Sequence, residues 1–370
     1  MAHATNALIM KEQNKKIILG TIFEKEASRA EIAKEIGLTK AAVSFLVDEL
    51  ISEGLIYEST LDDYKGVGRK PISLKIASNS YYSVGINITR KHCKIGIINM
   101  AGEVLCSDGF DSKDKEPLQI INKIIKVVEK QLSSFDLKRE HFIGVGITLP
   151  GPIDYKNNKI LTPPNFDKWH NFDLNILADA FNMPVYVENI SNGYSICEKY
   201  FGDCIGRKNY ITVLVDEGIG SGIVTNGHIY RGHKGLGNEF GHITINYQGK
   251  KCSCGNVGCL ERYASIPEIL SDTKYSAWRE VIDNCDADLI EKEAEYLSLG
   301  LTTVINLFDL KTVVLGGDIA YKGELLAEKI AKKLKERAIT KTDVEVIPSR
   351  LQDNVLIAGT IAINRFLREI

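Results

Sequence analysis

Residues 235–265, which read GLGNEFGHITINYQGKKCSCGNVGCLERYAS, hold the densest group of metal-ligating side chains in the sequence. One imidazole and three thiols lie within this stretch, at His242, Cys252, Cys254 and Cys259. Four such ligands are typical of a closed tetrahedral zinc site. The glycines among them let the backbone turn tightly enough for the thiols to face one ion. The stretch therefore predicts structural Zn²⁺ bound by these four residues.

Two alternatives to a zinc site are a redox pair and buried apolar cysteines, since a free cysteine often acts as a small core hydrophobe. Protein cores seldom place three cysteines in a loop rich in glycine and lysine, so the metal site is favoured. Two carboxylates flank the ligands, because Glu239 precedes His242 by three residues and Glu261 follows Cys259 by two. Each carboxylate alone would be expected to face solvent. Next to a metal-bound loop, both become candidates for binding a polar ligand.

The run Glu-x-Gly-His followed by Cys-x-Cys-Gly-x-x-Gly-Cys-x-Glu resembles the ROK family of sugar kinases and sugar-responsive repressors. The resemblance covers roughly residues 80–370. It implies that one set of residues forms the sugar pocket: Asn189, Glu239, His242, Glu261, Gly151 and Asn165. In this interpretation His242 also binds zinc through its other ring nitrogen. For Gly151 and Asn165, a plain loop role is an equal alternative.

Most signatures of the ROK kinases are missing. Residues 87–90 read Asn-Ile-Thr-Arg where the kinases carry an Asp-x-Gly-Gly-Thr phosphate loop. Asp216 and Glu217 precede the second glycine-rich turn, where their charges would repel nucleotide phosphates. The family's catalytic aspartate is replaced by Ile190, which cannot accept a proton. No catalytic residue is therefore expected, and only Gly316-Gly317 stays kinase-like.

The N-terminal segment, residues 1–77, has the pattern of a winged helix-turn-helix. An amphipathic helix is expected over 7–24, and a second helix begins at a Ser28–Glu31 capping box. After Gly37, Thr39 can cap a third helix. Two short helices joined by a tight glycine-containing turn suit insertion of the second helix into the major groove. Strands over 55–59 and 72–76, with a basic loop between them, would form the wing.

Two groups of residues in this segment are expected to contact double-stranded operator DNA: Thr39, Lys40, Ala41 and Ser44 at the start of the third helix, and Gly68, Arg69 and Lys70 on the wing. A Gly-Arg pair suits a narrow minor groove. The alternative is a three-helix protein-interaction module with a solvated basic loop. Residues 1–76 carry eleven Lys or Arg and eleven Asp or Glu, so DNA binding must come from local patches. The wing, placed where ROK repressors carry theirs, favours the DNA interpretation.

Residues 78–370 are expected to form an α/β body of two lobes, resembling the ribonuclease-H-like fold of actin and hexokinase. Lobe 1 would comprise residues 80–190 plus a C-terminal helix over 357–367, and lobe 2 residues 191–355. A ligand would lie in the cleft between the lobes, a usual location for small-molecule sites.

The bulk composition is that of an ordinary soluble protein, with 44% apolar and 25% charged residues among 370. No apolar run reaches the length needed to span a bilayer, so membrane insertion is not expected. Eight cysteines without a disulfide framework or signal peptide suggest a reducing cytoplasm. A net charge of −2 gives no global indication of a nucleic-acid partner.

These features together predict a sugar-responsive repressor, similar to the xylose-repressor branch of the family, with a catalytically inactive kinase-like domain. A homodimer or dimer of dimers would bind a palindromic operator, and a sugar in the cleft would switch it. The alternatives are an active ATP-dependent sugar kinase with a DNA-binding extension, and a scaffold controlled by another protein instead of a sugar.

Overall fold

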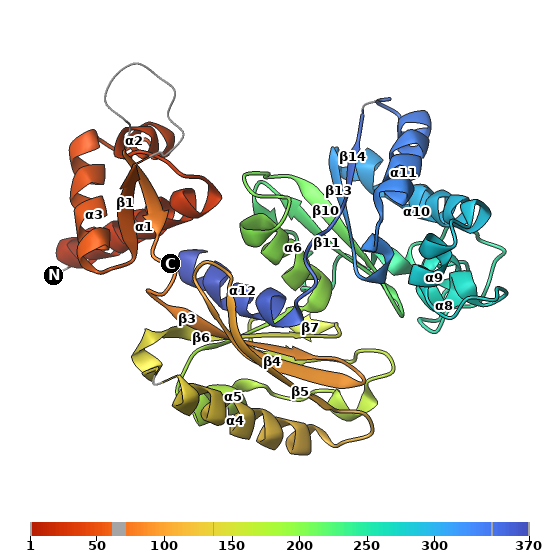
Figure 1. Cartoon of the computed structure of the whole chain (residues 1–370), viewed down its shortest axis with the longest axis horizontal. Helices are drawn as coiled ribbons and strands as arrows, with labels where there is room; N and C mark the ends of the chain where they lie inside the picture. The colour runs from red at the N-terminus through yellow and green to blue at the C-terminus, as the bar shows by residue number, and fades with distance from the viewer. Residues whose placement is uncertain (1, 61–71, 136, 342, 369–370) are drawn as a thin grey trace.

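The computed structural model describes residues 2–60, 72–135, 137–341 and 343–368. A small N-terminal unit lies against a body of two lobes, and each lobe is built on a five-stranded sheet (Figure 1). No helix in the described ranges combines the length and the apolar character needed to cross a bilayer.

The N-terminal unit contains α1 (Ala2–Glu24), α2 (Arg29–Ile36), α3 (Lys40–Ser52) and the antiparallel pair β1 (Ile56–Thr60) and β2 (Ile72–Ile76). The predicted helix-turn-helix is confirmed. Ser28 and Glu31 form the expected capping box, and Gly37 ends α2 in the left-handed region at φ 73°. The side chain of Thr39 accepts a hydrogen bond from the Ala42 amide at the start of α3. The wing residues Gly68, Arg69 and Lys70 lie outside the described residues.

Lobe 1 is built on a sheet of order β5-β4-β3-β6-β9, with bounds β3 (Tyr82–Ile88), β4 (His92–Asn99), β5 (Val104–Asp111), β6 (Phe142–Leu149) and β9 (Val185–Asn189). One face is covered by α4 (Pro117–Ser134) and α5 (Asn175–Phe181), and the other by α12 (Asn354–Arg368) (Figure 1). A β-carbon at Gly146 would lie 1.9 Å from the Ala358 carbonyl oxygen. Glycine therefore lets the C-terminal helix pack directly against the strand backbone, as the predicted return of this helix to lobe 1 requires. The lobe also contains a small hairpin and two short helices: β7 (Ile153–Asp154), β8 (Lys159–Ile160), η1 (Arg139–His141) and η2 (Asp167–Trp169).

Lobe 2 has the strand order β12-β11-β10-β13-β14, with bounds β10 (Tyr210–Val215), β11 (Ile219–Thr225), β12 (His228–Ile229), β13 (Thr312–Gly316) and β14 (Glu345–Pro348). Its core is formed by this sheet and by the helices that follow the cysteine-rich loop. The remaining helical segments are η3 (Phe240–His242), α7 (Glu261–Ala264), α8 (Ile266–Leu270), α9 (Trp278–Asp283), α10 (Ala287–Phe308), η4 (Asp318–Ala320) and α11 (Glu324–Arg337).

Helix α6 (Ile190–Phe201) connects the two lobes. It follows β9 of lobe 1 directly, packs along α12, and covers β10 and β11 of lobe 2. Its residues 191–200 are all buried. This helix was not predicted from the sequence.

The N-terminal unit shares a hydrophobic core with the body. Ile18, Leu19 and Ile22 of α1 belong to one buried cluster with Tyr200 of α6 and Ile363 of α12. The N-terminal helices are therefore packed against the body and not merely tethered to it.

A carboxyl group is buried without a partner in the core of lobe 2. Glu293 of α10 is fully buried, and neither of its oxygens has a hydrogen-bond partner among the described residues. Burial raises the pKa of this carboxyl well above its usual value of 4.5. This carboxyl therefore lowers the free energy of unfolding in a pH-dependent way. The loss is absent below the pKa that the carboxyl has in the unfolded chain, and it grows as the pH rises through the pKa that it has in the folded protein.

We expect Glu293→Met to stabilise the protein by about 1–3 kcal/mol near neutral pH, because a side chain of similar length removes a buried carboxyl that has no hydrogen-bond partner among the described residues. The gain should shrink as the pH is lowered toward the unfolded pKa. Melting curves of wild type and variant at several pH values measure it. The matched control is Glu328→Met on the exposed face of α11, which should give no pH-dependent gain; equal stability of Glu293→Met and wild type at every pH would contradict the prediction.

Candidate ligand pocket and metal centre

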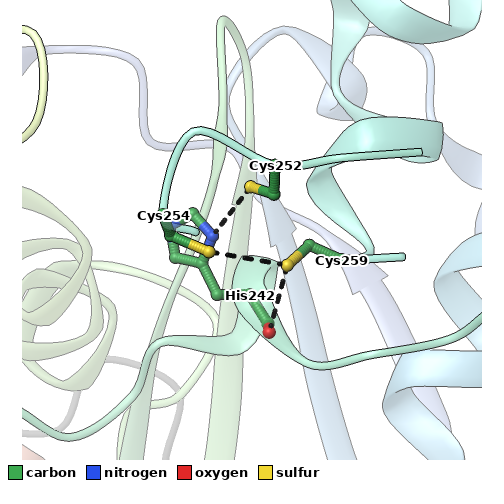
Figure 2. A group of neighbouring side chains, drawn as sticks. All are labelled: His242, Cys252, Cys254 and Cys259. Atoms are coloured by element: carbon green, nitrogen blue, oxygen red, sulfur yellow. Dashed lines mark hydrogen bonds between the residues drawn. The ribbon is translucent and has the colours of Figure 1, made fainter. Parts of the chain in front are cut away.

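The four predicted metal ligands converge in space. Figure 2 shows His242, Cys252, Cys254 and Cys259 facing one another, and their ligand atoms all lie within 4.8 Å of one another. His242 Nδ1 lies 3.6 Å from Cys252 Sγ, and the Sγ atoms of Cys254 and Cys259 are 3.7 Å apart. A tetrahedral zinc ion with Zn–S near 2.3 Å requires ligand–ligand distances of about 3.8 Å. The cluster therefore has the donor set and the spacing to hold a metal ion.

Local backbone geometry sets this cluster. His242 ends η3, and isolated bridges pair Thr244 with Cys259 and Lys251 with Val257, which folds the cysteine loop back on the histidine. Gly258 has φ 74°, and a β-carbon there would lie 1.6 Å from the Asn246 carbonyl oxygen. Only glycine fits this position. Because Nδ1 of His242 faces the thiols, Nε2 stays available to a ligand on the other side of the ring.

The two flanking carboxylates have different surroundings. Glu261 Oε2 accepts a hydrogen bond from the Ile219 amide at 3.0 Å, and a β-carbon at Gly218 would lie 2.6 Å from the same oxygen. Glu261 thus holds the turn between β10 and β11. Glu239 is exposed at the rim of the cleft, and partial loss of solvent around its carboxyl raises its pKa; the charge of His242 opposes this effect and that of Glu261 adds to it.

A polar cavity of about 40 Å³ lies between the lobes next to Glu239. Its lining residues come from both lobes and from the first turn of α6: Pro152, Ile153, Glu188, Asn189, Ser191, Asn192, Gly220, Ser221, Gly235, Gly237, Asn238 and Glu239. Two of the six predicted sugar-pocket residues, Asn189 and Glu239, are in this set. Gly151 lies directly behind Asn189, since a β-carbon there would be 2.5 Å from Asn189 Nδ2. Asn165 is exposed on a left-handed turn at φ 56° and is not brought to the cavity.

An ion pair that was not predicted from the sequence crosses the cleft at this cavity. Arg231, which follows β12 of lobe 2, donates to Glu188 Oε2 of lobe 1 at 2.9 and 2.6 Å. Its guanidinium also stacks over the Tyr155 ring of lobe 1, at 4.7 Å from the ring centroid. The Glu188 side chain is 5% exposed and that of Arg231 is 19% exposed, so the pair is largely removed from water.

Two asparagines extend this network to the first turn of α6. Asn192 Nδ2 donates to Glu188 Oε1 at 3.0 Å, and Asn238 Nδ2 donates to Asn192 Oδ1 at 3.1 Å. The other amide atom, Asn238 Oδ1, is buried without a hydrogen-bond partner among the described residues. A buried acceptor of this kind is costly unless a donor reaches it. The cavity therefore offers a place for a ligand hydroxyl.

Comparison with known proteins decides the family. The sequence model of the ROK family matches residues 83–365. The chain belongs to the ROK family. It is 32% identical to a xylose repressor from Caldicellulosiruptor bescii, with 96% of each chain covered, and 30% identical to a xylose repressor from Bacillus subtilis, with 97% of each covered.

Solved ROK structures agree with the predicted fold. A ROK family transcriptional regulator, described as a homologue of the E. coli MLC protein, superimposes with a TM-score of 0.78 at 25% identity and covers 96% of this chain and 97% of its own. A ROK glucokinase from Streptomyces griseus, solved with glucose and AMPPNP, has a TM-score of 0.64 at 23% identity. It covers 99% of its own chain but 76% of this one, so this likeness concerns the fold of the body alone.

The segment that resembles the nucleotide site of ROK kinases is occupied by the protein's own carboxylates. Asp216 Oδ1 accepts a hydrogen bond from the Asp318 amide at 2.6 Å and lies against the kinase-like Gly317, where a β-carbon would be 2.5 Å from it. Burial raises the pKa of Asp216. Glu217 forms an ion pair with Lys91 of lobe 1. A backbone amide that could bind a phosphate oxygen is thus already used by an anionic side chain.

The predicted DNA-contact residues that the structure describes lie at the start of α3. Thr39, Lys40 and Ala41 are exposed at the start of α3, and Ser44 is half-buried one turn later. Arg29 of α2 fixes the two helices relative to each other, since it donates to the Ser44 carbonyl at 3.2 Å and pairs with Asp48 at 2.7 Å.

Proposed function

We propose that this ROK protein is a transcriptional repressor that binds operator DNA and is switched by a sugar. One observation carries the proposal: the buried helix α6 contacts both the helix-turn-helix unit and the polar cleft beside the cluster of metal ligands. The chain's identity to named xylose repressors over nearly its full length supports the same function.

The ligand we propose is a sugar bound between the lobes. Asn189, Glu239 and Asn238 supply hydrogen-bonding groups in the cavity, and His242 Nε2 and Glu261 would complete the site once a ligand is present. A cavity of 40 Å³ has room for about three water molecules. A monosaccharide is larger, so binding requires the walls of the cleft to move apart. A ligand that binds only the more open arrangement shifts the balance between two conformations of the protein.

The metal we propose is a structural Zn²⁺ held by His242, Cys252, Cys254 and Cys259. It would fix the segment from Glu239 to Glu261 by four bonds and leave no open coordination position for chemistry. Thiolate ligands must stay reduced to bind metal, so we place the protein in the cytoplasm.

Helix α6 is the route by which we expect the pocket to affect DNA binding. Its N-terminal turn carries Asn192, which lines the cavity, and its C-terminal turn carries Lys199 and Tyr200, which contact the end of α1. Lys199 Nζ pairs with Glu24 of α1 at 3.0 Å, and Tyr200 packs against Phe23 with ring centroids 5.7 Å apart. A twelve-residue helix spans about 18 Å. A shift of its first turn therefore reaches the helix-turn-helix through one rigid element.

On the DNA side, a homodimer would place two copies of α3 on a palindromic operator. The contacts we propose are Thr39, Lys40, Ala41 and Ser44 in the major groove and the wing residues Gly68, Arg69 and Lys70 in the minor groove.

Replacing Phe23 with alanine is expected to uncouple the two sites. The variant should still bind sugar with wild-type affinity, because Phe23 is far from the pocket along α6. The ratio of operator affinities with and without sugar should fall about tenfold or more, since the loss of the two aromatic contacts of Phe23 with Tyr200 and Phe201 of α6 removes about 1–3 kcal/mol of coupling. Fluorescence anisotropy of a labelled operator measures the ratio. Phe135→Ala, on the exposed end of α4, is the control, and an unchanged ratio in Phe23→Ala would refute the α6 route.

The alternative function, an ATP-dependent sugar kinase, is tested together with ligand binding. A thermal-shift screen of neutral monosaccharides and disaccharides should give a hit, since a ligand at 100 times its dissociation constant stabilises the folded state by about 2.7 kcal/mol. With ATP and magnesium, each hit should yield no sugar phosphate. Turnover above about 1 s⁻¹, within the usual enzyme range, would show that the protein is a kinase.

A further inference from the structure

A second cavity, separate from the sugar pocket, lies at the other end of α6. It has a volume of about 150 Å³ and is bounded by α6, by β12 and the residues around it, and by the end of α12. Five of its lining residues are basic: Lys199, His228, Arg231, Arg365 and Arg368. Among the described lining residues there is no aspartate or glutamate.

The cationic groups converge on one side of this cavity. Arg368 Nη1 lies 2.8 Å from His228 Nδ1, which makes the arginine the donor. At the adjacent Gly227, a β-carbon would lie 3.6 Å from Arg368 Nη2 and 3.9 Å from Lys199 Nζ. Two cations from different helices thus point to the same small region, and glycine leaves that region open.

Lys199 is the best-buried cation in this group. It is only 6% exposed, and burial together with the charge of Arg368 lowers its pKa. Burial and the charges of Arg368, Lys199 and Arg231 also lower the pKa of His228. Arg368 and Lys199, whose charges converge beside Gly227, repel each other in this partly dry site, and an anion placed between them would stabilise both.

We propose that this cavity binds a small phosphate-bearing anion. Cations reach it from α6 and α12 and an imidazole from β12, and a tetrahedral oxyanion with oxygens in several directions matches that arrangement better than a planar carboxylate does. Arginine also binds phosphate in a bidentate manner. The cavity is larger than a bare phosphate needs, so the ligand would be a phosphate ester or a diphosphate, with Lys199, His228 and Arg368 as the main contacts.

Occupation of this site would affect the N-terminal unit. The carboxylate that pairs with Lys199 is Glu24, the last residue of α1, at 3.0 Å. An anion in the cavity competes with Glu24 for the same ammonium group. The site would therefore loosen the contact between α6 and α1 and change operator affinity independently of the sugar.

The binding test uses isothermal titration of the full-length protein with pyrophosphate, inorganic phosphate and citrate at constant ionic strength. Pyrophosphate should bind at one site per chain and more tightly than citrate. Arg368→Gln and Lys199→Met should each weaken pyrophosphate at least about tenfold, since each removes a charge-assisted hydrogen bond. Glu24→Gln should tighten it, because the competing carboxylate is gone. Arg279→Gln, on α9 of lobe 2, is the control for loss of a surface charge.

Three results would overturn the proposal. The first is no binding of pyrophosphate, and the second is wild-type affinity in both Arg368→Gln and Lys199→Met. The third is citrate binding at least as tight as pyrophosphate, which would mean a general carboxylate or counter-ion site. Arg368 is the last residue of α12, so its replacement should disturb folding less than replacement of the buried Lys199. Arg368→Gln therefore still tests the proposal if Lys199→Met fails to fold.

Discussion

Replacing Cys254 with serine is expected to leave the purified protein with almost no bound metal. Wild type should contain one zinc ion per chain, because four donors already lie within 4.8 Å of one another. Cys254 is exposed, so its loss opens no cavity in the core and acts through the metal alone. Structural zinc contributes on the order of 10 kcal/mol to the folding of small metal-bound units. The variant should therefore also melt at a clearly lower temperature and lose its response to sugar.

Elemental analysis and melting curves measure both effects, with Cys285→Ser as the matched control. Cys285 is also an exposed cysteine of lobe 2, but it lies away from the cluster, so its replacement should change neither zinc content nor stability. Full zinc occupancy in Cys254→Ser would mean that other residues hold the metal.

Reversing the charge of Lys40 should abolish specific operator binding. Lys40 is exposed at the first position of α3. We propose that this N-terminal end of α3 enters the major groove. A glutamate there would bring a negative charge to the phosphates and bases, and we expect operator affinity to fall about 100-fold or more at physiological salt. Sugar binding and melting temperature should stay as in wild type.

The matched control for this prediction is Lys311→Glu, the same change at an exposed position of lobe 2. It alters the net charge equally but lies on the body, so operator affinity should fall only slightly. Equal losses in both variants would mean that the effect is one of overall charge, and an unchanged affinity in Lys40→Glu would exclude α3 as the recognition helix.

Local signals in the sequence were sufficient for much of the fold. The capping box at Ser28, the stop at Gly37 and the cap at Thr39 are short-range features, and the helices begin and end where these features indicate. The metal cluster was equally accessible, because its ligands lie close together in sequence and the glycines between them permit only tight turns.

Helix α6 was missed for a physical reason. Its sequence, ISNGYSICEKYF, contains asparagine, glycine and serine, which are poor helix formers, and it has no solvent-facing side to produce an amphipathic pattern. Burial stabilises it instead: Gly193 leaves so little space that a β-carbon there would lie 2.7 Å from Thr148 of β6. The one local sign was Asn189, whose side chain caps the helix by accepting from the Ser191 amide.

The cleft residues were missed because their partners are distant in sequence. Arg231 and Glu188 are 43 residues apart and lie in different lobes, and no local pattern marks them as a pair. Asn238 stands next to the predicted Glu239, but its buried acceptor becomes visible only once the network around Asn192 is assembled. Asn165 illustrates the converse case, since a short resemblance suggested a pocket role for a residue that lies on an exposed turn.

The affinity of the full-length protein for its operator, titrated with and without a sugar that the thermal-shift screen has identified, tests the central claim most directly. We predict that a saturating sugar changes the dissociation constant at least about tenfold, which corresponds to 1.4 kcal/mol of coupling between the two sites. Identical operator affinity with and without every sugar that binds would contradict a sugar-switched repressor.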